Sequence, residues 1–133
     1  MAKGINRVTL VGYLGQEPKI FREAEIAVAK LSLATSEEWT DKLTGEEKKQ
    51  TEWHRVTLFG KLADVAEKFL HTGSLIFVEG QLQTHRWKDQ RDIERYTTEI
   101  VVKHGGTMQM LGQATGTQSE LLASSPIDFD EDA

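Results

Sequence analysis

Five segments of alternating apolar and polar residues, together with one helical pattern, constrain the fold of this chain more than any other feature. The segments span residues 7–14, 27–35, 50–60, 75–88 and 95–103, and each reads as a half-buried β-strand. Residues 61–72, between the third and fourth segments, carry apolar residues at helical spacing: Leu62, Val65, Ala66 and Phe69. Gly73 stands where a left-handed C-terminal cap is expected, so this stretch is predicted to be a helix.

This order of elements predicts an all-β protein with the OB-fold. That fold is a five-stranded Greek-key barrel, here with one helix between strands 3 and 4. A generic α+β sheet has a similar number of elements, so the order alone leaves this alternative open. The OB-fold hosts several functions, and function therefore has to be argued from the site.

The composition changes near residue 104, after which the chain is rich in Gly, Gln, Ser and Thr. Such a segment buries too little apolar surface to offset its ordering entropy. We therefore predict an OB-fold domain over residues 1–111 and a disordered linker with an acidic tail over residues 112–133. The net charge of −5 arises in this tail: five of the 21 acidic residues lie in residues 120–133, which leaves 16 against 16 basic residues upstream. A neutral body can still carry a basic groove.

Several classes of protein are disfavoured by what the sequence lacks. The chain has no cysteine, so disulfides and thiolate metal sites are excluded, and no metal or cofactor is expected. No apolar run approaches the ~18 residues of a membrane span. The N-terminal residues lack a signal-peptide apolar block, so we expect a cytoplasmic protein without a membrane partner.

Large aromatic residues occupy the polar side of the predicted strands. In the third strand, Val56 and Leu58 share the apolar side with His54, whereas Trp53 and Phe59 alternate with Arg55 and Thr57. In the fourth strand the aliphatic side carries Ile76, Val78 and Leu82, and the other side carries Gln81, Gln83, His85 and Trp87. Trp39 opens the polar stretch of residues 37–50. Core packing is the usual role of an aromatic in a strand, but it explains none of these three tryptophans well.

Aromatic residues interleaved with cations are typical of surfaces that bind single-stranded nucleic acid. Unpaired bases stack on aromatic planes with little regard to sequence, at ~1–3 kcal/mol per base. Neighbouring Lys and Arg side chains neutralise phosphates and release counterions. Two charged loops, residues 40–50 and 87–96, adjoin tryptophan-bearing strand ends and favour a clamp around the strand.

The sequence resembles the bacterial single-stranded DNA-binding protein family over about residues 4–112. The motifs that carry the resemblance are GINRVTLVGYLGQEP, LATSEEWTDKLTGE, QTEWHRVTLFGKLADVAEKFL, VEGQLQTHRWKDQ and RYTTEIVVKHGGTMQMLG. The resemblance implies an OB-fold homotetramer in the bacterial cytoplasm, associated with the nucleoid, that wraps single-stranded DNA in replication, recombination and repair. It implies stacking by Trp39, Trp53, Phe59 and Trp87, and phosphate contacts by Lys42, Lys61 and Arg86, with Lys3, Arg7 and Arg55 as additions. It also implies that His54 lies at a subunit interface.

The chain departs from the family pattern at five places, one of which is a shortened hairpin region around Phe21–Ile26. His71–Gly73 is neutral where the family often carries basic residues, and His85 replaces a usual arginine. The linker is short. The acidic tip resembles the family's partner-binding tip but lacks its final Pro-Phe pair, which puts docking of replication and repair proteins in question. The residues of this tip are Pro126, Ile127, Asp128, Phe129, Asp130, Glu131 and Asp132.

Two other classes of function compete with DNA binding. A dimeric OB-fold protein-interaction module of the primosome or replication-restart type needs no tryptophan platform. A nuclease needs an acidic or metal constellation, but Asp64 and Glu67 are one turn apart on the helix and read as its solvated side. Glu52 and His54 have no third group at metal-ligand spacing. The sequence therefore predicts a binding protein with no catalytic residues.

Overall fold

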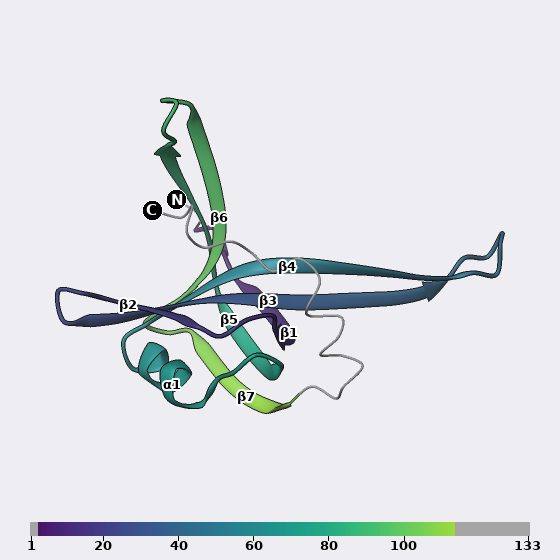
Figure 1. The fold of residues 1–133 in the computed structure, drawn as a ribbon, viewed down its shortest axis with the longest axis horizontal. Helices are drawn as coiled ribbons and strands as arrows, with labels where there is room; N and C mark the ends of the chain where they lie inside the picture. The colour runs from purple at the N-terminus through teal and green to yellow at the C-terminus, as the bar shows by residue number, and fades with distance from the viewer. Residues whose placement is uncertain (1–2, 114–133) are drawn as a thin grey trace.

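A closed barrel of five strands forms the centre of the computed structural model, which describes residues 3–113 (Figure 1). Around the barrel, β1 (Val8–Leu14) pairs with β3 (Ile26–Thr40), β3 with β4 (Glu47–Phe59), β4 with β6 (Glu94–Val102), and β6 with β5 (Ser74–Lys88). The ring closes where β5 pairs with β1. The β4–β6 pairing is parallel and the others are antiparallel. Helix α1 (Lys61–Phe69) connects β4 to β5, the third and fourth strands of the barrel. The predicted OB-fold is confirmed.

Two strands outside the ring were not predicted from the sequence. β2 (Lys19–Glu23) pairs with β3, and β7 (Thr107–Gln113) pairs with the first half of β5. The latter strand places Met108 opposite Val78 and Met110 opposite Ile76, so its two methionines cover the end of the core. β7 also extends past the expected domain boundary at residue 111. The predicted disordered tail otherwise lies outside the described residues.

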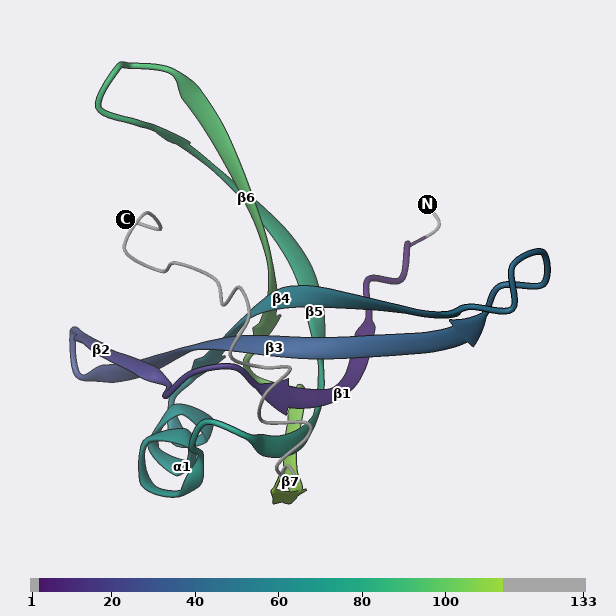
Figure 2. The ribbon, with the colours of Figure 1, turned by 45° about the vertical axis from the view of Figure 1, so that its right-hand side comes forward.

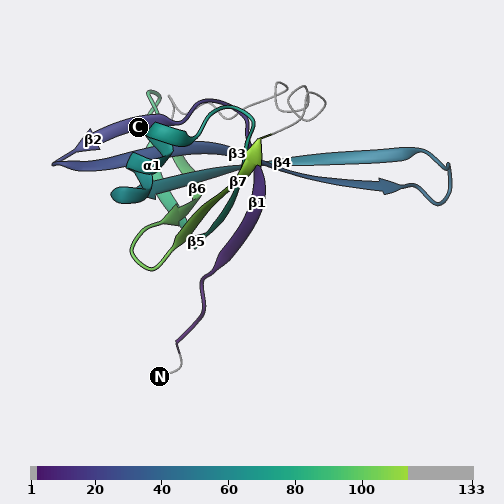
Figure 3. The same ribbon diagram turned by 90° about the horizontal axis from the view of Figure 1, so that it is seen from below.

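Three hairpins extend from the barrel and give the molecule its shape. The β3–β4 arm and the tip of the β2–β3 hairpin point in opposite directions, and the β5–β6 arm rises from a third side (Figures 1 and 2). The β3–β4 arm is paired from Thr40 and Glu47 inward, so the polar stretch expected to be a solvated hairpin is largely a two-stranded ribbon. The view from below shows how far this arm projects beyond the barrel (Figure 3).

The core lies where the alternation of the strands predicts it. Val56, Leu58, Ile76 and Val78 are all buried, as are Leu31 and Leu33 of β3 and Ile100 and Val102 of β6. Leu82 is an exception, because it lies beyond the barrel where β5 enters its arm, and its side chain is exposed.

The end of the helix differs from the prediction. α1 stops at Phe69 instead of residue 72, and Phe69 is 55% exposed although its spacing predicted burial. Leu70 takes an extended conformation directly after the helix and enters the core in its place, alongside Ala63 and Ala66. Gly73 has a positive φ of 90°, but it serves the turn in which the Ser74 amide donates to the His71 carbonyl, not a helix cap.

Candidate nucleic-acid interface

The predicted site residues that share one surface lie on the side of β4, β6 and β5 turned away from the core. On β4 this side alternates with the buried residues Val56 and Leu58, and cross-strand pairing extends it to β3 and, through Thr57 and Val101, to β6. We call this surface the outer face, and define it by Ser32, Ala34, Trp53, Arg55, Thr57, Phe59, His85, Trp87 and Glu99. The predicted strand sides of Trp53, Phe59 and Trp87 are thus those seen in the structure.

Trp53 is seated on the backbone of the segment that follows β1. A Cβ atom added to Gly15 would lie 2.3 Å from the Trp53 ring, so only glycine leaves room for the indole there. Gly15 is itself held by a hydrogen bond from its amide to the Ser32 carbonyl at 2.9 Å. The Trp53 ring is half-buried, with one part packed on the barrel and the remainder open to a ligand.

Trp87 is oriented by a side-chain hydrogen bond at the start of the β5–β6 arm. Its indole Nε1 donates to the Thr97 hydroxyl oxygen at 2.8 Å, and Thr97 lies opposite His85 in the strand register. A hydrogen bond at the edge of the indole leaves the ring plane unobstructed by that partner. The arrangement fixes the direction of the ring and leaves Trp87 half-buried.

A buried carboxylate lies between the two tryptophans of the outer face, and sequence reasoning missed it. Glu99 is only 6% exposed, and it accepts a hydrogen bond from the Thr57 hydroxyl at 2.9 Å. His85 Nε2 lies 2.8 Å from its other oxygen. The two oxygens of this carboxyl group therefore have separate hydrogen-bond partners, on β4 and on β5. The signal in the sequence was an acid directly before the apolar run Ile100–Val102.

Arg55 is the predicted cation that the structure places among the aromatic residues. It lies between Trp53 and Phe59 along β4 and is half-buried. Arg86 points to the other side of its arm, where its Nε lies 2.9 Å from a Glu94 carboxylate oxygen. Arg7 lies 3.8 Å from Glu79. Lys3 and Lys61 are both exposed. Lys61 is the first residue of α1.

Trp39 and Lys42 lie on the β3–β4 arm and are not brought to the outer face. Trp39 is opposite Lys48 in the register and is 47% exposed. By strand alternation it belongs to the same side as Thr35 and His54, which is the side opposite Trp53. Lys42 is exposed in the turn at the end of the arm. Within one chain, Trp53, Phe59 and Trp87 therefore share the outer face, and Trp39 lies apart from them.

His54 is half-buried on the core-facing side of β4. Its Nε2 lies 2.8 Å from the Thr35 hydroxyl oxygen. Burial lowers the pKa of His54 below its ordinary value of 6.5, although the nearby Glu52 carboxylate acts in the opposite direction. The ring is therefore a neutral hydrogen-bonding group at pH 7. Its predicted place at a subunit interface remains a prediction.

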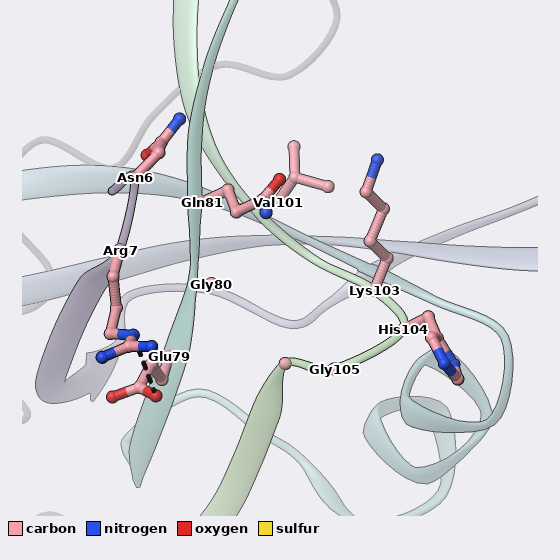
Figure 4. Close-up of a pocket in the computed structure, with 10 residues that line it drawn as sticks. Asn6, Arg7, Glu79, Gly80, Gln81, Val101, Lys103, His104 and Gly105 are labelled. Carbon is pink, nitrogen blue, oxygen red and sulfur yellow. Dashed lines mark ion pairs between the residues drawn. The ribbon is translucent and has the colours of Figure 1, made fainter. Parts of the chain in front are cut away.

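A small hollow adjoins the outer face near the ends of β1 and β6 (Figure 4). Its volume is about 200 Å³, below the ~300–1,000 Å³ usual for small-molecule pockets. The Arg7–Glu79 ion pair lies on one side of it and Lys103 and His104 lie on the other (Figure 4). Its lining mixes charged and polar side chains with Val101 and three glycines. It therefore does not resemble an apolar cofactor pocket.

Two further predictions concern metals and the acidic tip. Within residues 3–113, no three His, Asp or Glu side chains converge as a metal site requires. The partner-binding tip, residues 126–132, lies outside the described part of the chain. The described part of the chain has one helix, α1, of nine residues. It is not long and apolar enough to cross a membrane.

The fold and this surface together define an OB-fold protein whose candidate site is an open, aromatic strand surface. The chain belongs to the single-strand binding protein family, whose model matches residues 5–111. It is similar to a solved structure described as the Plasmodium falciparum SSB complex with ssDNA. That likeness has 33% sequence identity and a TM-score of 0.75, and covers 84% of this chain and 98% of the other.

A second solved structure is a deletion mutant of the single-stranded DNA binding protein from Thermus aquaticus. It is 30% identical with a TM-score of 0.67, and the match covers 84% of this chain and 52% of that one. Family membership is therefore supported by the family model and by the Plasmodium falciparum structure.

Proposed function

We propose that this protein is a non-enzymatic protein that binds single-stranded DNA without regard to sequence. The observation that carries the proposal is the outer face, on which Trp53, Phe59 and Trp87 accompany Arg55 on one continuous sheet surface. The open parts of these half-buried rings can stack on any base, and the arginine neutralises phosphate. A duplex hides its base planes and gains little from such a surface. Family membership and the relative solved with single-stranded DNA support the same function.

In the cell, such binding holds the single strands of replication, recombination and repair intermediates in an extended form. The outer face offers no catalytic constellation: its one carboxylate is buried and hydrogen-bonded to Thr57 and His85. We place this activity in the bacterial cytoplasm, at the nucleoid, on the basis of the sequence resemblance. Partners that dock on the acidic tip remain a proposal that deletion of residues 120–133 would test in a pull-down with replication proteins.

We further infer that the protein acts as a homotetramer. β1 supports self-association, because it pairs with β5 over Val8–Tyr13 but with β3 only at Tyr13 and Leu14. The other edge of β1 is unpaired before Tyr13 within the described chain, and Val11 beside it is 50% exposed. An unpaired strand edge is a template for pairing with a second copy. Light scattering should give four times the 15.0 kDa chain mass, and a dimer would instead favour the replication-restart class.

The function itself is tested by titrating the protein with oligo-dT while its tryptophan emission is recorded. Stacking on Trp53 and Trp87 should quench the emission, and the affinity should fall steeply as salt rises. A duplex of the same length serves as the control and should quench far less. If the emission stays unchanged at low salt, or if the duplex quenches equally, the proposed function is wrong.

A further inference from the structure

The outer face continues across β3 onto β2, the strand that the sequence did not predict. Cross-strand pairing places Phe21 opposite Val28 and Val28 opposite Phe59, so these side chains form one row over three strands. The next row joins Lys19, Lys30 and Thr57 in the same way. Directly paired residues share a side of the sheet, with Cβ atoms ~4.5–5.5 Å apart. Phe21 and Lys19 therefore belong to the same surface as Phe59.

The contacts of the neighbouring residues support this orientation of β2. Arg22, next to Phe21, forms ion pairs with α1 at 2.9 Å to Glu67 and 3.7 Å to Asp64. Ile20, also next to Phe21, packs against the core. Successive strand residues point to opposite sides, so Phe21 points away from the helix. In Figure 1 the helix lies below this hairpin, which leaves the upper side open.

A tight turn fixes the register that brings Phe21 into line with Phe59. Glu23 pairs with Ile26 around a two-residue loop of Ala24 and Glu25. Both loop residues have positive φ, 47° and 72°, as a type I′ hairpin turn requires, although neither is glycine. Hairpin register follows from turn geometry. The row of Phe21, Val28 and Phe59 is therefore a defined feature of the fold.

The two rows combine an exposed ring with two cations. Phe21 is 43% exposed, so much of its ring lies outside the core. Lys19 and Lys30 are directly opposite each other, so two cations lie side by side next to this ring. A phosphate at this position would be attracted by both charges. An exposed ring next to a pair of cations repeats the combination of Phe59 and Arg55 on the outer face.

We propose that single-stranded DNA bound on the outer face continues over β2, with a base stacked on Phe21 and a phosphate held by Lys19 and Lys30. This inference rests on the proposed function and extends the binding path beyond the four predicted stacking residues. Glu23 follows Phe21 on the same side of β2, and its negative charge marks the end of the path near the hairpin turn.

The first test places a reporter at Phe21. In Phe21→Trp, the added tryptophan should be quenched by saturating oligo-dT, and the affinity should be equal or higher. Phe69→Trp is the matched control, because Phe69 is also exposed but lies on α1, the side to which Arg22 points. Its added emission should persist. If wild-type protein is quenched by oligo-dT but the tryptophan at position 21 is not, this inference is wrong while the proposed function stands. If wild-type protein itself is not quenched, the proposed function fails first.

The second test removes the Phe21 ring and the Lys30 charge in separate variants. Phe21→Ala should weaken binding about fivefold or more, from the lower end of the stacking range, and Phe69→Ala should not. Lys30→Ala should reduce the slope of log affinity against log salt by about 0.7, the value for one phosphate contact on a single strand. Lys68→Ala on α1 is its control. Light scattering is recorded for each variant: a lower oligomer mass for Phe21→Ala would show that a second copy of the chain covers this surface and would overturn the inference.

Discussion

The barrel and the arms present their candidate binding residues in different ways. Trp53 is seated on Gly15, and Thr57 holds a buried carboxylate, so the barrel part of the outer face is fixed by packing on both sides of β4. Trp39 and Arg86 lie on two-stranded ribbons with a cross-strand lysine and a surface ion pair as neighbours. An isolated two-stranded hairpin is marginally stable in water. The stacking surface of the barrel is therefore ordered before DNA binds, whereas the arms become ordered through their contacts.

The largest effect should follow from removing the barrel tryptophan. Trp53→Ala should cost about 1–3 kcal/mol of binding free energy for oligo-dT, because a fixed ring loses no freedom when a base stacks on it. Fluorescence anisotropy of a labelled oligonucleotide measures the affinity. Trp53→Phe keeps a ring and should recover part of the loss. Equal affinities for wild type and Trp53→Ala would contradict the assignment of β4 as a DNA-binding strand.

Substitution of Glu99 tests whether its buried hydrogen bonds hold the barrel part of the outer face in place. Glu99→Ala leaves the Thr57 hydroxyl buried without its acceptor and should lower the free energy of unfolding by about 1–3 kcal/mol. Glu99→Gln retains an acceptor of the same size and should cost less. Thr98→Ala is the control on the arm side, where Thr84 and Thr98 pair in the open. Urea unfolding measures all three, and similar losses for Thr98→Ala and Glu99→Ala would remove the distinction between barrel and arm.

A smaller effect is expected on the β3–β4 arm. Trp39→Ala should weaken oligo-dT binding by about 1 kcal/mol, the low end of the stacking range, because its ribbon must be ordered on binding. The free energy of unfolding should change by less than about 0.5 kcal/mol, since the side chain is exposed. Anisotropy and urea unfolding measure the two. A loss of affinity equal to that of Trp53→Ala would show that the arm is as well prepared as the barrel.

The smallest effect concerns His54 and pH. Its pKa is lower in the fold than the value of 6.5 expected when unfolded, so the unfolded chain takes up the proton first as pH falls. The stability contributed by the neutral ring is full above pH 6.5 and is lost progressively below it. The loss should be less than about 1 kcal/mol, because the ring is half-buried and water screens its charge. Urea unfolding at pH 7.5 and 5.5 should show a smaller acid loss in His54→Gln than in wild type, and an identical loss would contradict the burial effect.

Alternation along single strands was sufficient to predict much of the barrel. Val56 and Leu58 are buried and Trp53 and Phe59 face the other way because β4 is a regular strand whose core side is unambiguous. Five such strands and one helix matched the Greek-key order, although a generic α+β sheet has a similar number of elements. These features depend on local pattern, which a sequence displays directly.

Features that depend on pairing between distant segments were not predictable in this way. β2 and β7 are short, and each is a strand because β3 or β5 offers it an edge. Phe69 fits the helical spacing but is displaced by Leu70, whose burial depends on where the chain turns back into the barrel. Glu99 is acceptable inside the sheet only because Thr57 and His85 meet it from two other strands. The side of the sheet on which Trp39 lies depends on the continuation of β3 as a strand to Thr40, which the sequence pattern did not indicate.

The central claim is that single-stranded DNA lies on the outer face, and cross-linking tests it most directly. Oligo-dT containing 5-bromodeoxyuridine, bound to the full chain and irradiated, should form cross-links that peptide mapping assigns to β4 and β5, at Trp53, Phe59 and Trp87. The inference on β2 adds Phe21 to this set. Cross-links concentrated on α1 or β7, with β4 unmodified in a complex of full affinity, would contradict the account.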